Sequence, residues 1–316
     1  MITFGPVPSR RLGRSLGINN IPPKSCTYSC VYCQVGPTHH REVEPRTFYI
    51  PEQILSEIEA SVEVATQAGQ SIDYLTFVPD GEPTLDENLG RTIELLRPLG
   101  LKIAVISNAS LIWREDVRER LAGADWLSLK VDSTDENLWR RINQPHPSLQ
   151  LQKILKGIQL VAETYQGELT TETMLVNGIN DGDVAIAEVS KYLEQLNPGK
   201  AYLAAPIRPA AEVGIHPPTE EKINRAFQML RKRVSQAEYL IGYEGNAFAS
   251  TGNVVDDLLS ITSVHPLREE AVMALLKKTG NDWSIVKALI NEDRLKEAEY
   301  EGKRFYVRVL KQSKSD

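Results

Sequence analysis

Short runs of β-branched and apolar residues alternate with longer amphipathic stretches over most of this 316-residue chain. Such alternation is typical of βα units, in which parallel strands form a sheet that helices cover. The candidate strands are LGINNI (16–21), IDYLTFVP (72–79), LKIAVISN (101–108), WLSLKVD (126–132), LTTETMLVN (169–177) and AYLAAPI (201–207). Six such units predict an α/β fold, a partial (β/α)6 TIM-like barrel, whose active site forms from loops after the carboxyl ends of the strands.

Helical patterns separate the candidate strands. One of them has proline at its first position, Pro51, and glycine as a C-terminal stop at Gly69. The other amphipathic stretches are 87–100, 114–123, 148–165, 183–197 and 220–233. A proline-rich segment, APIRPAAEVGIHPPT (205–219), predicts a long surface loop before the last of them, and EYLIGY (238–243) predicts a short strand after it.

The last 60 or so residues follow a different order. Two short helical patterns, 268–280 and 282–294, precede two candidate strands about a tight turn at Gly302. Helix, helix, hairpin is the order of a winged-helix unit, so we expect a core domain over 1–255 and a small winged-helix-like domain over 256–316. Such units bind nucleic acid or contact other proteins, and residues 257–316 hold 11 Lys/Arg against 10 Asp/Glu. This near balance favours a packing or interaction role over a phosphate-binding face.

Composition excludes several classes of protein. The formal net charge of −6 argues against indiscriminate binding to nucleic acid or anionic lipid. The apolar runs are shorter than the ~20 residues that cross a bilayer, and the first residues carry proline and arginine where a signal peptide is apolar. Three cysteines make a poor disulfide framework, so we expect a cytoplasmic protein with no membrane partner.

All three cysteines lie within eight consecutive residues, CTYSCVYC, as Cys26, Cys30 and Cys33. Thiolates this close repel one another unless a positive centre neutralises them, and soft sulfur donors favour iron–sulfur clusters, zinc or copper(I). Three interpretations compete: buried structural thiols, a zinc site with His39 or His40 as the fourth ligand, and a [4Fe–4S] cluster. A cluster held by three protein ligands leaves one iron open for a substrate or cofactor.

The segment CTYSCVYC resembles the signature of the radical S-adenosylmethionine (SAM) superfamily, whose members hold a [4Fe–4S] cluster on three cysteines. The resemblance implies that the open iron binds the amino and carboxylate groups of SAM, and that Tyr32 lies near the adenine. The family places a Gly-Gly-Glu-Pro segment after the second strand, against the methionyl amino group. Here PDGEPTL (79–85) keeps Gly81, Glu82 and Pro83, whereas Asp80 replaces the first glycine.

Polar residues at the later strand ends complete the site that the resemblance implies, because the family uses these positions for the SAM carboxylate, ribose and adenine. They are Ser107, Asn108, Ser128, Lys130, Asp132, Asn177, Gly178 and Arg208. Hydrogen bonds inside the barrel account for the strand-end residues equally well. Lys130 is also a candidate catalytic base or imine former, with an ion pair to Asp132 or to SAM as the alternative.

Residues 4–36 as a whole resemble a narrower branch, the radical SAM proteins related to the wyosine-forming tRNA synthases. Those enzymes carry a second cluster on further cysteines, and this chain has no cysteines left for one. Their reaction is therefore not transferred to it. The arginines of the same run, Arg10, Arg11 and Arg14, either clamp a phosphate or carboxylate near the barrel mouth or form a solvated surface.

The expected function is that of a radical SAM enzyme. An electron donor such as flavodoxin or ferredoxin reduces the cluster, and cleavage of SAM gives a 5′-deoxyadenosyl radical that abstracts hydrogen from a substrate. RNA is the favoured substrate class, because of the branch resemblance and the C-terminal unit, and a peptide or protein is the second. A zinc-stabilised binding protein without catalysis is the alternative from another class.

Overall fold

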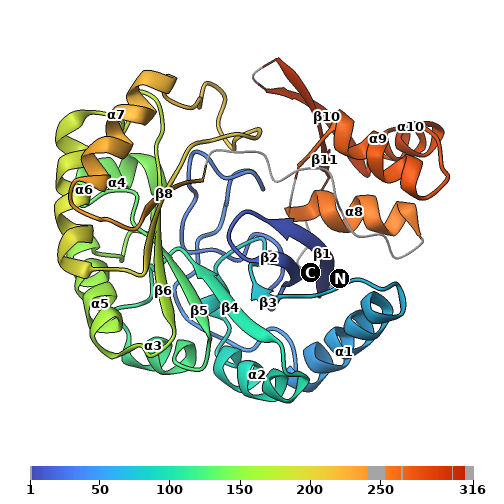
Figure 1. Ribbon diagram of the computed structural model, residues 1–316, viewed down its shortest axis with the longest axis horizontal. Coiled ribbons are helices and arrows are strands. Elements are labelled where there is room, and N and C mark those ends of the chain that lie inside the picture. The colour runs from blue at the N-terminus through green and yellow to red at the C-terminus, as the bar shows by residue number, and fades with distance from the viewer. Residues whose placement is uncertain (1, 241–252, 265, 301, 310–316) are drawn as a thin grey trace.

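The computed structural model describes residues 2–240, 253–264, 266–300 and 302–309. Within these ranges eight strands form one curled sheet in the order β1 to β8, and helices surround it on the outside (Figure 1). The strands are β1 (Thr3–Ser9), β2 (Gly13–Ile18), β3 (Tyr74–Phe77), β4 (Lys102–Ser107), β5 (Trp126–Lys130), β6 (Glu168–Met174), β7 (Lys200–Ala204) and β8 (Ala237–Leu240). Strands β2 to β8 are parallel, whereas β1 pairs antiparallel with β2. The predicted α/β partial barrel is confirmed.

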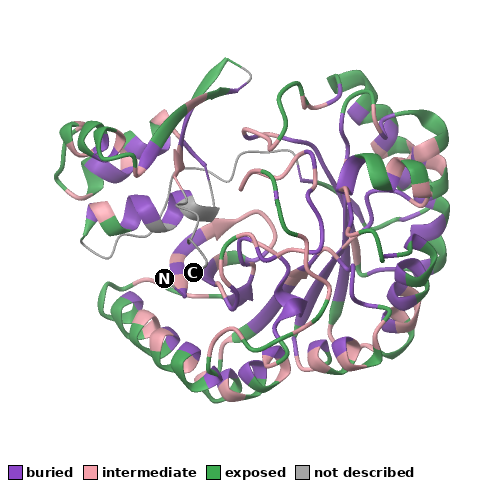
Figure 2. Cartoon of the chain, turned by 180° about the vertical axis from the view of Figure 1, so that it is seen from behind, coloured by how far each residue is buried: buried purple, intermediate pink, exposed green. Residues whose placement is uncertain are grey.

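All six helices predicted between the strands of the core are present within the predicted stretches. They are α1 (Pro51–Gln67), α2 (Leu89–Leu96), α3 (Glu115–Leu121), α5 (Leu151–Thr164), α6 (Asp183–Leu196) and α7 (Glu220–Arg231). Pro51 occupies the first position of α1, where its missing N–H is no loss. Each of these helices buries one face against the sheet and leaves the other to solvent, as the purple and green bands of Figure 2 show.

The N-terminal hairpin departs from the prediction. The strand predicted at 16–21 is β2, which begins at Gly13 and ends at Ile18. The sequence pattern does not predict β1, because Pro6 and Pro8 interrupt it. Strand β1 lies at the edge of the sheet and has one neighbouring strand, β2. The N–H groups that its prolines lack are therefore not needed to bond a second strand.

Helix α4 (Glu136–Asn143) is a second element that the hydrophobic pattern does not predict. It has only eight residues, so its apolar stripe of Leu138, Trp139 and Ile142 is too brief to detect by periodicity. The local signal for it is Asp135, whose carboxylate accepts hydrogen bonds from the backbone N–H groups of Asn137 and Leu138, each 2.9 Å long. The end of α4 carries Asn143 to the loop that holds the cysteines.

The proline-rich segment 205–219 contains no helix or strand, as predicted, but it is not wholly a surface loop. Ala205, Pro206 and Arg208 are buried, because the segment turns inward over the end of the sheet before it reaches α7. The strand predicted at 238–243 is present as β8, and the part after Leu240 lies outside the described residues.

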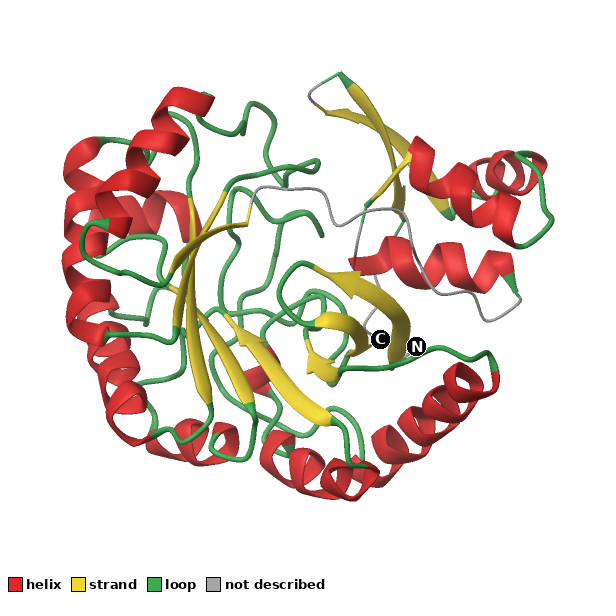
Figure 3. Cartoon of the chain, viewed as in Figure 1, coloured by secondary structure: helices red, strands yellow, loops and turns green. Residues whose placement is uncertain are grey.

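The C-terminal part contains the predicted two helices and hairpin in the predicted order (Figure 3). Its elements are α8 (Val254–Val264), β9 (Leu267–Arg268), α9 (Glu269–Lys278), α10 (Ser284–Asn291), β10 (Leu295–Tyr300) and β11 (Lys303–Arg308). The three strands form a small sheet in the order β10–β11–β9. The winged-helix assignment and the boundary at 255/256 stay predictions, and that boundary falls in the first turn of α8.

The C-terminal elements share an apolar core with the edge strand of the barrel. Phe4 and Val7 of β1 pack in one cluster with Leu258 of α8 and Tyr306 of β11, all of them buried. A separate cluster contains Leu12 of the turn between β1 and β2 together with buried residues of β4, β5, β7 and β8, among them Trp126.

Candidate cofactor-binding site

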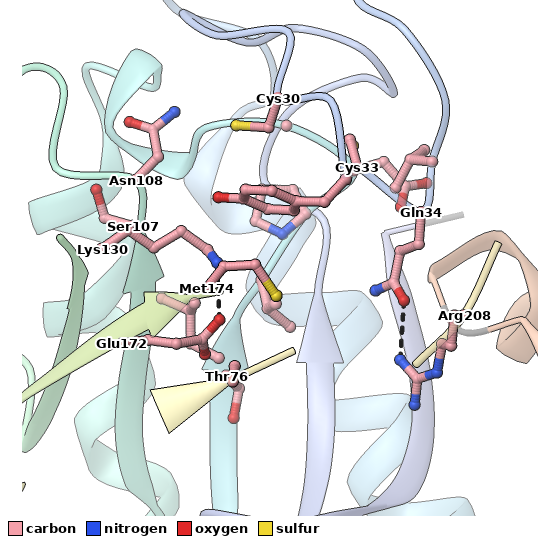
Figure 4. Close-up of a pocket in the computed structure, with 18 of the residues that line it drawn as sticks. Cys30, Cys33, Gln34, Thr76, Ser107, Asn108, Lys130, Glu172, Met174 and Arg208 are labelled. Atoms are coloured by element: carbon pink, nitrogen blue, oxygen red, sulfur yellow. Dashed lines mark hydrogen bonds and ion pairs between the residues drawn. The ribbon is translucent and has the colours of Figure 1, made fainter. Parts of the chain in front are cut away.

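A cavity of about 340 Å³ lies at the carboxyl ends of the parallel strands. Its wall contains residues from the ends of β4 to β7, the segment after β3, the turn between β1 and β2, and the loop after β2. Figure 4 shows the labelled side chains that converge on it from these elements. This is the position at which barrel enzymes of the βα type place their active sites.

The three cysteines line this cavity from the loop after β2. Two backbone hydrogen bonds tie that loop to the segment after β3, from Lys24 N to Asp80 O at 2.8 Å and from Glu82 N to Ser25 O at 2.9 Å. Between them, a Cβ on Gly81 would lie 2.0 Å from the Ser25 carbonyl oxygen. Only glycine allows this approach, so Gly81 fixes the cysteine loop against the sheet.

Side-chain amides approach two of the thiols. Asn108 Nδ2 lies 3.6 Å from Cys26 Sγ, and Asn143 Nδ2 lies 3.4 Å from Cys30 Sγ. Burial, and then the neighbouring Cys30, raise the pKa of Cys26, while burial and Asp132 raise the pKa of Cys30 to about 12. Thiolates in this setting need a cationic partner, and an iron–sulfur core supplies one. The donor set therefore fits such a cluster.

The zinc interpretation finds no such support. His39 and His40, its expected fourth ligands, are exposed and are not among the residues that line the cavity.

Glu82 is completely buried and lies outside the cavity lining. Its carboxylate accepts hydrogen bonds from Thr84 N at 3.1 Å, Thr84 Oγ1 at 2.6 Å, Ser107 Oγ at 2.7 Å and Asn108 N at 2.7 Å. Burial raises the pKa of Glu82, and the hydrogen bonds from Thr84, Asn108 and Ser107 oppose that shift. Glu82 thus holds two strand-end residues that themselves line the cavity.

Asp132 has a similar supporting position and is also absent from the cavity lining. Its carboxylate accepts hydrogen bonds from Tyr32 Oη, from Asn143 Nδ2 at 2.7 Å and from Met174 N at 2.8 Å. Asn180 donates to its carbonyl oxygen at 2.9 Å. Asp132 therefore orients Tyr32, which lines the cavity, and joins it to the amide beside Cys30.

Lys130 forms an ion pair within the cavity wall. Its Nζ lies 2.7 Å from Glu172 Oε1, and Arg11 binds the other oxygen of the same carboxylate (Figure 4 shows Lys130 and Glu172). Burial works to raise the pKa of Glu172, but Lys130 and Arg11 hold it at about 2. Burial likewise works to lower the pKa of Lys130, but Glu172 and Asp132 raise it above its ordinary value. Lys130 is therefore charged and forms an ion pair, as one of the two alternatives predicts. Its partner in the structure is Glu172, whereas the prediction named Asp132 or SAM.

Two predicted residues lie away from the cavity. Ser128 is buried in β5, and its hydroxyl has no hydrogen-bond partner in the described structure. Asn177 is exposed, and its backbone N–H donates to His216 O at 3.1 Å. Neither is among the lining residues, whereas Ser107 and Asn108 are.

Several residues that line the cavity were not identified from the sequence. Lys24, Gln34, Glu172 and Met174 all line the cavity, although no motif singles them out. The signal for Glu172 is a charged residue in the buried part of β6, ELTTETM, whose other charged residue, Glu168, is the exposed first position. Arg10 and Arg11 line the cavity as one of the two hypotheses requires. Arg14 does not line it, and its backbone N–H donates to Asp73.

The cysteine loop and strand-end cavity together define a class of barrel enzyme, and comparison with known families identifies it. A model of the radical SAM superfamily matches residues 20–189, and the chain belongs to this superfamily. Radical SAM enzymes use a [4Fe–4S] cluster and SAM, and these are the cofactors of this enzyme.

Two relatives that match nearly the whole chain are proteins of the UPF0026 group. UPF0026 protein MJ1312 of Methanocaldococcus jannaschii is 48% identical, covering 98% of this chain and 97% of that protein. A UPF0026 protein of Helicobacter pylori is 30% identical, covering 93% of each. The predicted kinship with radical SAM proteins is confirmed over residues 20–189, and the UPF0026 relatives match nearly the full chain.

Solved structures share the fold. A radical SAM methyltransferase from Sphaerobacter thermophilus aligns with a TM-score of 0.55 and 19% identity, covering 72% of this chain and 66% of that one. TYW1 with a bound lysine–pyruvate adduct also aligns with a TM-score of 0.55 and 19% identity, covering 71% and 76%. At this identity the likeness concerns the fold alone. None of the helices that the structure describes has the length and apolar character to span a membrane.

Proposed function

We propose that Cys26, Cys30 and Cys33 hold the [4Fe–4S] cluster and that the enzyme uses SAM to abstract a hydrogen atom from a substrate. The observation that carries this proposal is that one short loop brings all three thiols to the cavity at the strand ends. The chemistry that the bound cofactors supply is one-electron cleavage of the sulfonium, giving methionine and a 5′-deoxyadenosyl radical. A flavodoxin or ferredoxin is the proposed electron donor.

The protein itself contributes by binding and orienting the cofactors and the substrate and by excluding water from the cavity. Asn108 and Asn143 place amide N–H groups at two of the sulfurs, where such donors tune a cluster. For SAM we propose contacts from the predicted residues that line the cavity, which are Tyr32, Gly81, Ser107, Asn108 and Lys130. Glu82 and Asp132 position these residues by hydrogen bonds, Glu82 to Ser107 and Asn108 and Asp132 to Tyr32.

We propose RNA as the substrate class. The support is the resemblance of the N-terminal run to the wyosine-related branch, together with the basic side chains of the cavity wall. Five basic residues, Arg10, Arg11, Lys24, Lys130 and Arg208, line the cavity against two acids, Asp80 and Glu172, in a protein whose net charge is −6. Cationic walls in an otherwise acidic protein focus the field on an anionic substrate such as a phosphodiester.

Metal analysis tests the cofactor proposal. Anaerobically purified wild-type protein is expected to be brown and to hold about four irons with matching sulfide, and Cys30→Ala is expected to lose the iron and SAM cleavage. A His39→Ala, His40→Ala double variant is the matched control and should keep its iron. One zinc per chain, or SAM cleavage that survives in Cys30→Ala, would overturn the assignment.

Capture of the substrate tests the RNA proposal. Anaerobic pull-down from cell extract is expected to retain RNA that nuclease removes, with an affinity that falls steeply as salt rises. Labelled hydrogen from the captured RNA should then appear in 5′-deoxyadenosine. Label that arrives from a peptide fraction instead would replace RNA by a peptide or protein substrate.

A further inference from the structure

Lys24 is a half-buried lysine that stands two residues before the first cysteine and lines the cofactor cavity. Its backbone has a φ of 71°, in the left-handed region that a residue with a Cβ rarely adopts. Glycine would adopt this conformation without the steric cost. A lysine held in this conformation indicates that its side chain supplies something that the site needs.

The side chain of Lys24 closes the loop that carries the cysteines. Its Nζ donates to the carbonyl oxygen of Gly36, and Gly36 N donates in turn to Cys33 O at 3.2 Å. At the backbone, Lys24 N donates to Asp80 O at 2.8 Å, which fixes the start of the loop to the segment after β3. The ammonium is therefore held at the point where the two ends of the cysteine loop meet.

The ammonium of Lys24 lies close enough to Cys33 and Cys26 for charge on their sulfur atoms to act on it. Burial lowers the pKa of Lys24, and negative charge on Cys33 and Asp80 opposes that shift. An anionic assembly bound at the cysteines adds to this opposing effect and favours the charged lysine. A cluster bound there therefore faces a positive charge on this side of the cavity.

The acids of the cavity wall do not cancel this charge. Glu172 is paired with Lys130 and Arg11. Burial raises the pKa of Asp80 to about 7, so this acid carries only part of a negative charge near neutral pH. Asp80 therefore offsets the charge of Lys24 only in part.

A positive charge beside a thiolate-bound cluster favours the reduced state of that cluster. The reducing electron adds negative charge to an assembly that is already anionic, and interactions between charges are strong where water is excluded. The reduction potentials of such clusters depend on net charge and surroundings for this reason.

We propose that the ammonium of Lys24 raises the reduction potential of the cluster and so favours its reduction by the electron donor. The inference rests on the proposed function, because it takes the cysteines as the cluster ligands. In this step one electron passes from the reduced flavodoxin or ferredoxin to the cluster, and no bond forms or breaks. The role is electrostatic, and it is separate from that of the residues proposed to contact SAM.

A redox titration of the anaerobically reconstituted full chain, followed by electron paramagnetic resonance without SAM, tests this role. In Lys24→Met the equilibrium constant for reduction of the cluster is expected to fall about tenfold, which is about 59 mV for a one-electron couple. Lys24→Arg keeps the charge and should restore most of the wild-type potential. Lys191→Met removes an exposed lysine of α6 and is the matched control, which should titrate as the wild type does.

Lys24→Gln separates the charge from the closure of the loop, because glutamine keeps an N–H donor for Gly36 without a charge. It is expected to shift the equilibrium as Lys24→Met does, and it replaces that variant if Lys24→Met holds no iron. An unchanged potential in Lys24→Gln, or the same downward shift in Lys24→Arg, would overturn the proposal. A wild type without iron and without the resonance of a reduced cluster would instead contradict the proposed function, so the two failures are distinguishable.

Discussion

The carboxylate of Glu82 faces strand ends rather than the cavity. Its acceptor sites are occupied by Thr84, Ser107 and Asn108, so it determines where two cavity residues lie. At the scale of single residues, we therefore propose that Glu82, the acid of the motif, acts as a positioning residue. The neighbouring acid, Asp80, lines the cavity, and its Oδ1 has no hydrogen-bond partner in the described structure.

This difference predicts the effect of Glu82→Ala. The substitution leaves the buried donors of Thr84, Ser107 and Asn108 without an acceptor, and each unmet buried donor costs about 1–3 kcal/mol. We expect the free energy of unfolding to fall by about 3 kcal/mol or more, as measured by urea denaturation under anaerobic conditions. A variant with unchanged stability and weaker SAM binding would show that Glu82 contacts the ligand directly.

Lys130 illustrates how a partner decides the chemistry of a residue. A lysine in a dry pocket becomes a base or imine former only if its pKa is lowered. Here Glu172 lies 2.7 Å away and the pKa of Lys130 is raised. The arrangement favours a fixed positive charge in the cavity wall over a nucleophilic amine.

At the scale of elements, the cysteine loop is positioned by what it packs against rather than by regular structure of its own. It is bound on one side to the segment after β3, through Lys24 and Glu82. On the other side, Ser29 N and Val31 N donate to carbonyl oxygens at the end of α4. The loop therefore depends on two elements that are distant from it in the sequence.

Gly81→Ala tests this dependence. The added Cβ would lie 2.0 Å from the Ser25 carbonyl oxygen, so the cysteine loop must move away from the sheet. We expect iron content after anaerobic reconstitution to fall well below that of the wild type. Gly182→Ala, at a position with nothing within 4 Å, is the control and should load iron normally. Full iron loading in Gly81→Ala would mean that the loop is not fixed by this contact.

At the scale of the whole molecule, the barrel and the C-terminal elements share a hydrophobic core. Strand β1 contributes Phe4 and Val7 to it, and α8 contributes Leu258. Tyr300 of β10 also donates to the Pro206 carbonyl oxygen at 3.1 Å, so the hairpin contacts the segment that lines the cavity. The shared core predicts that the two parts unfold together.

Leu258→Ala measures this coupling. The side chain is 0% exposed, and truncation of such a leucine costs about 2–5 kcal/mol. We expect one cooperative thermal transition in the wild type, shifted as a whole to lower temperature in the variant. Met273→Ala on the exposed face of α9 should leave the transition within experimental error. Two transitions, with only the smaller one shifted, would show that the C-terminal elements fold independently.

The sequence by itself determined the fold class, the cofactors and most of the helices. Hydrophobic periodicity is a local property, so the six strands and the helices between them can be predicted from neighbouring residues. The cysteine spacing is local as well, because all three thiols lie on one short loop. Three elements were not predicted in this way, namely the proline-containing β1, the eight-residue α4 and α8.

Only the tertiary structure decided which polar side chains reach the cavity. Glu82, Asp132 and Asp80 look equivalent in sequence, since each is an acid at or near a strand end. Their roles diverge because donors from other elements occupy the first two and leave the third open. Hydrogen-bond partners far apart in the chain are brought together by the closing of the sheet, and no local pattern encodes that outcome.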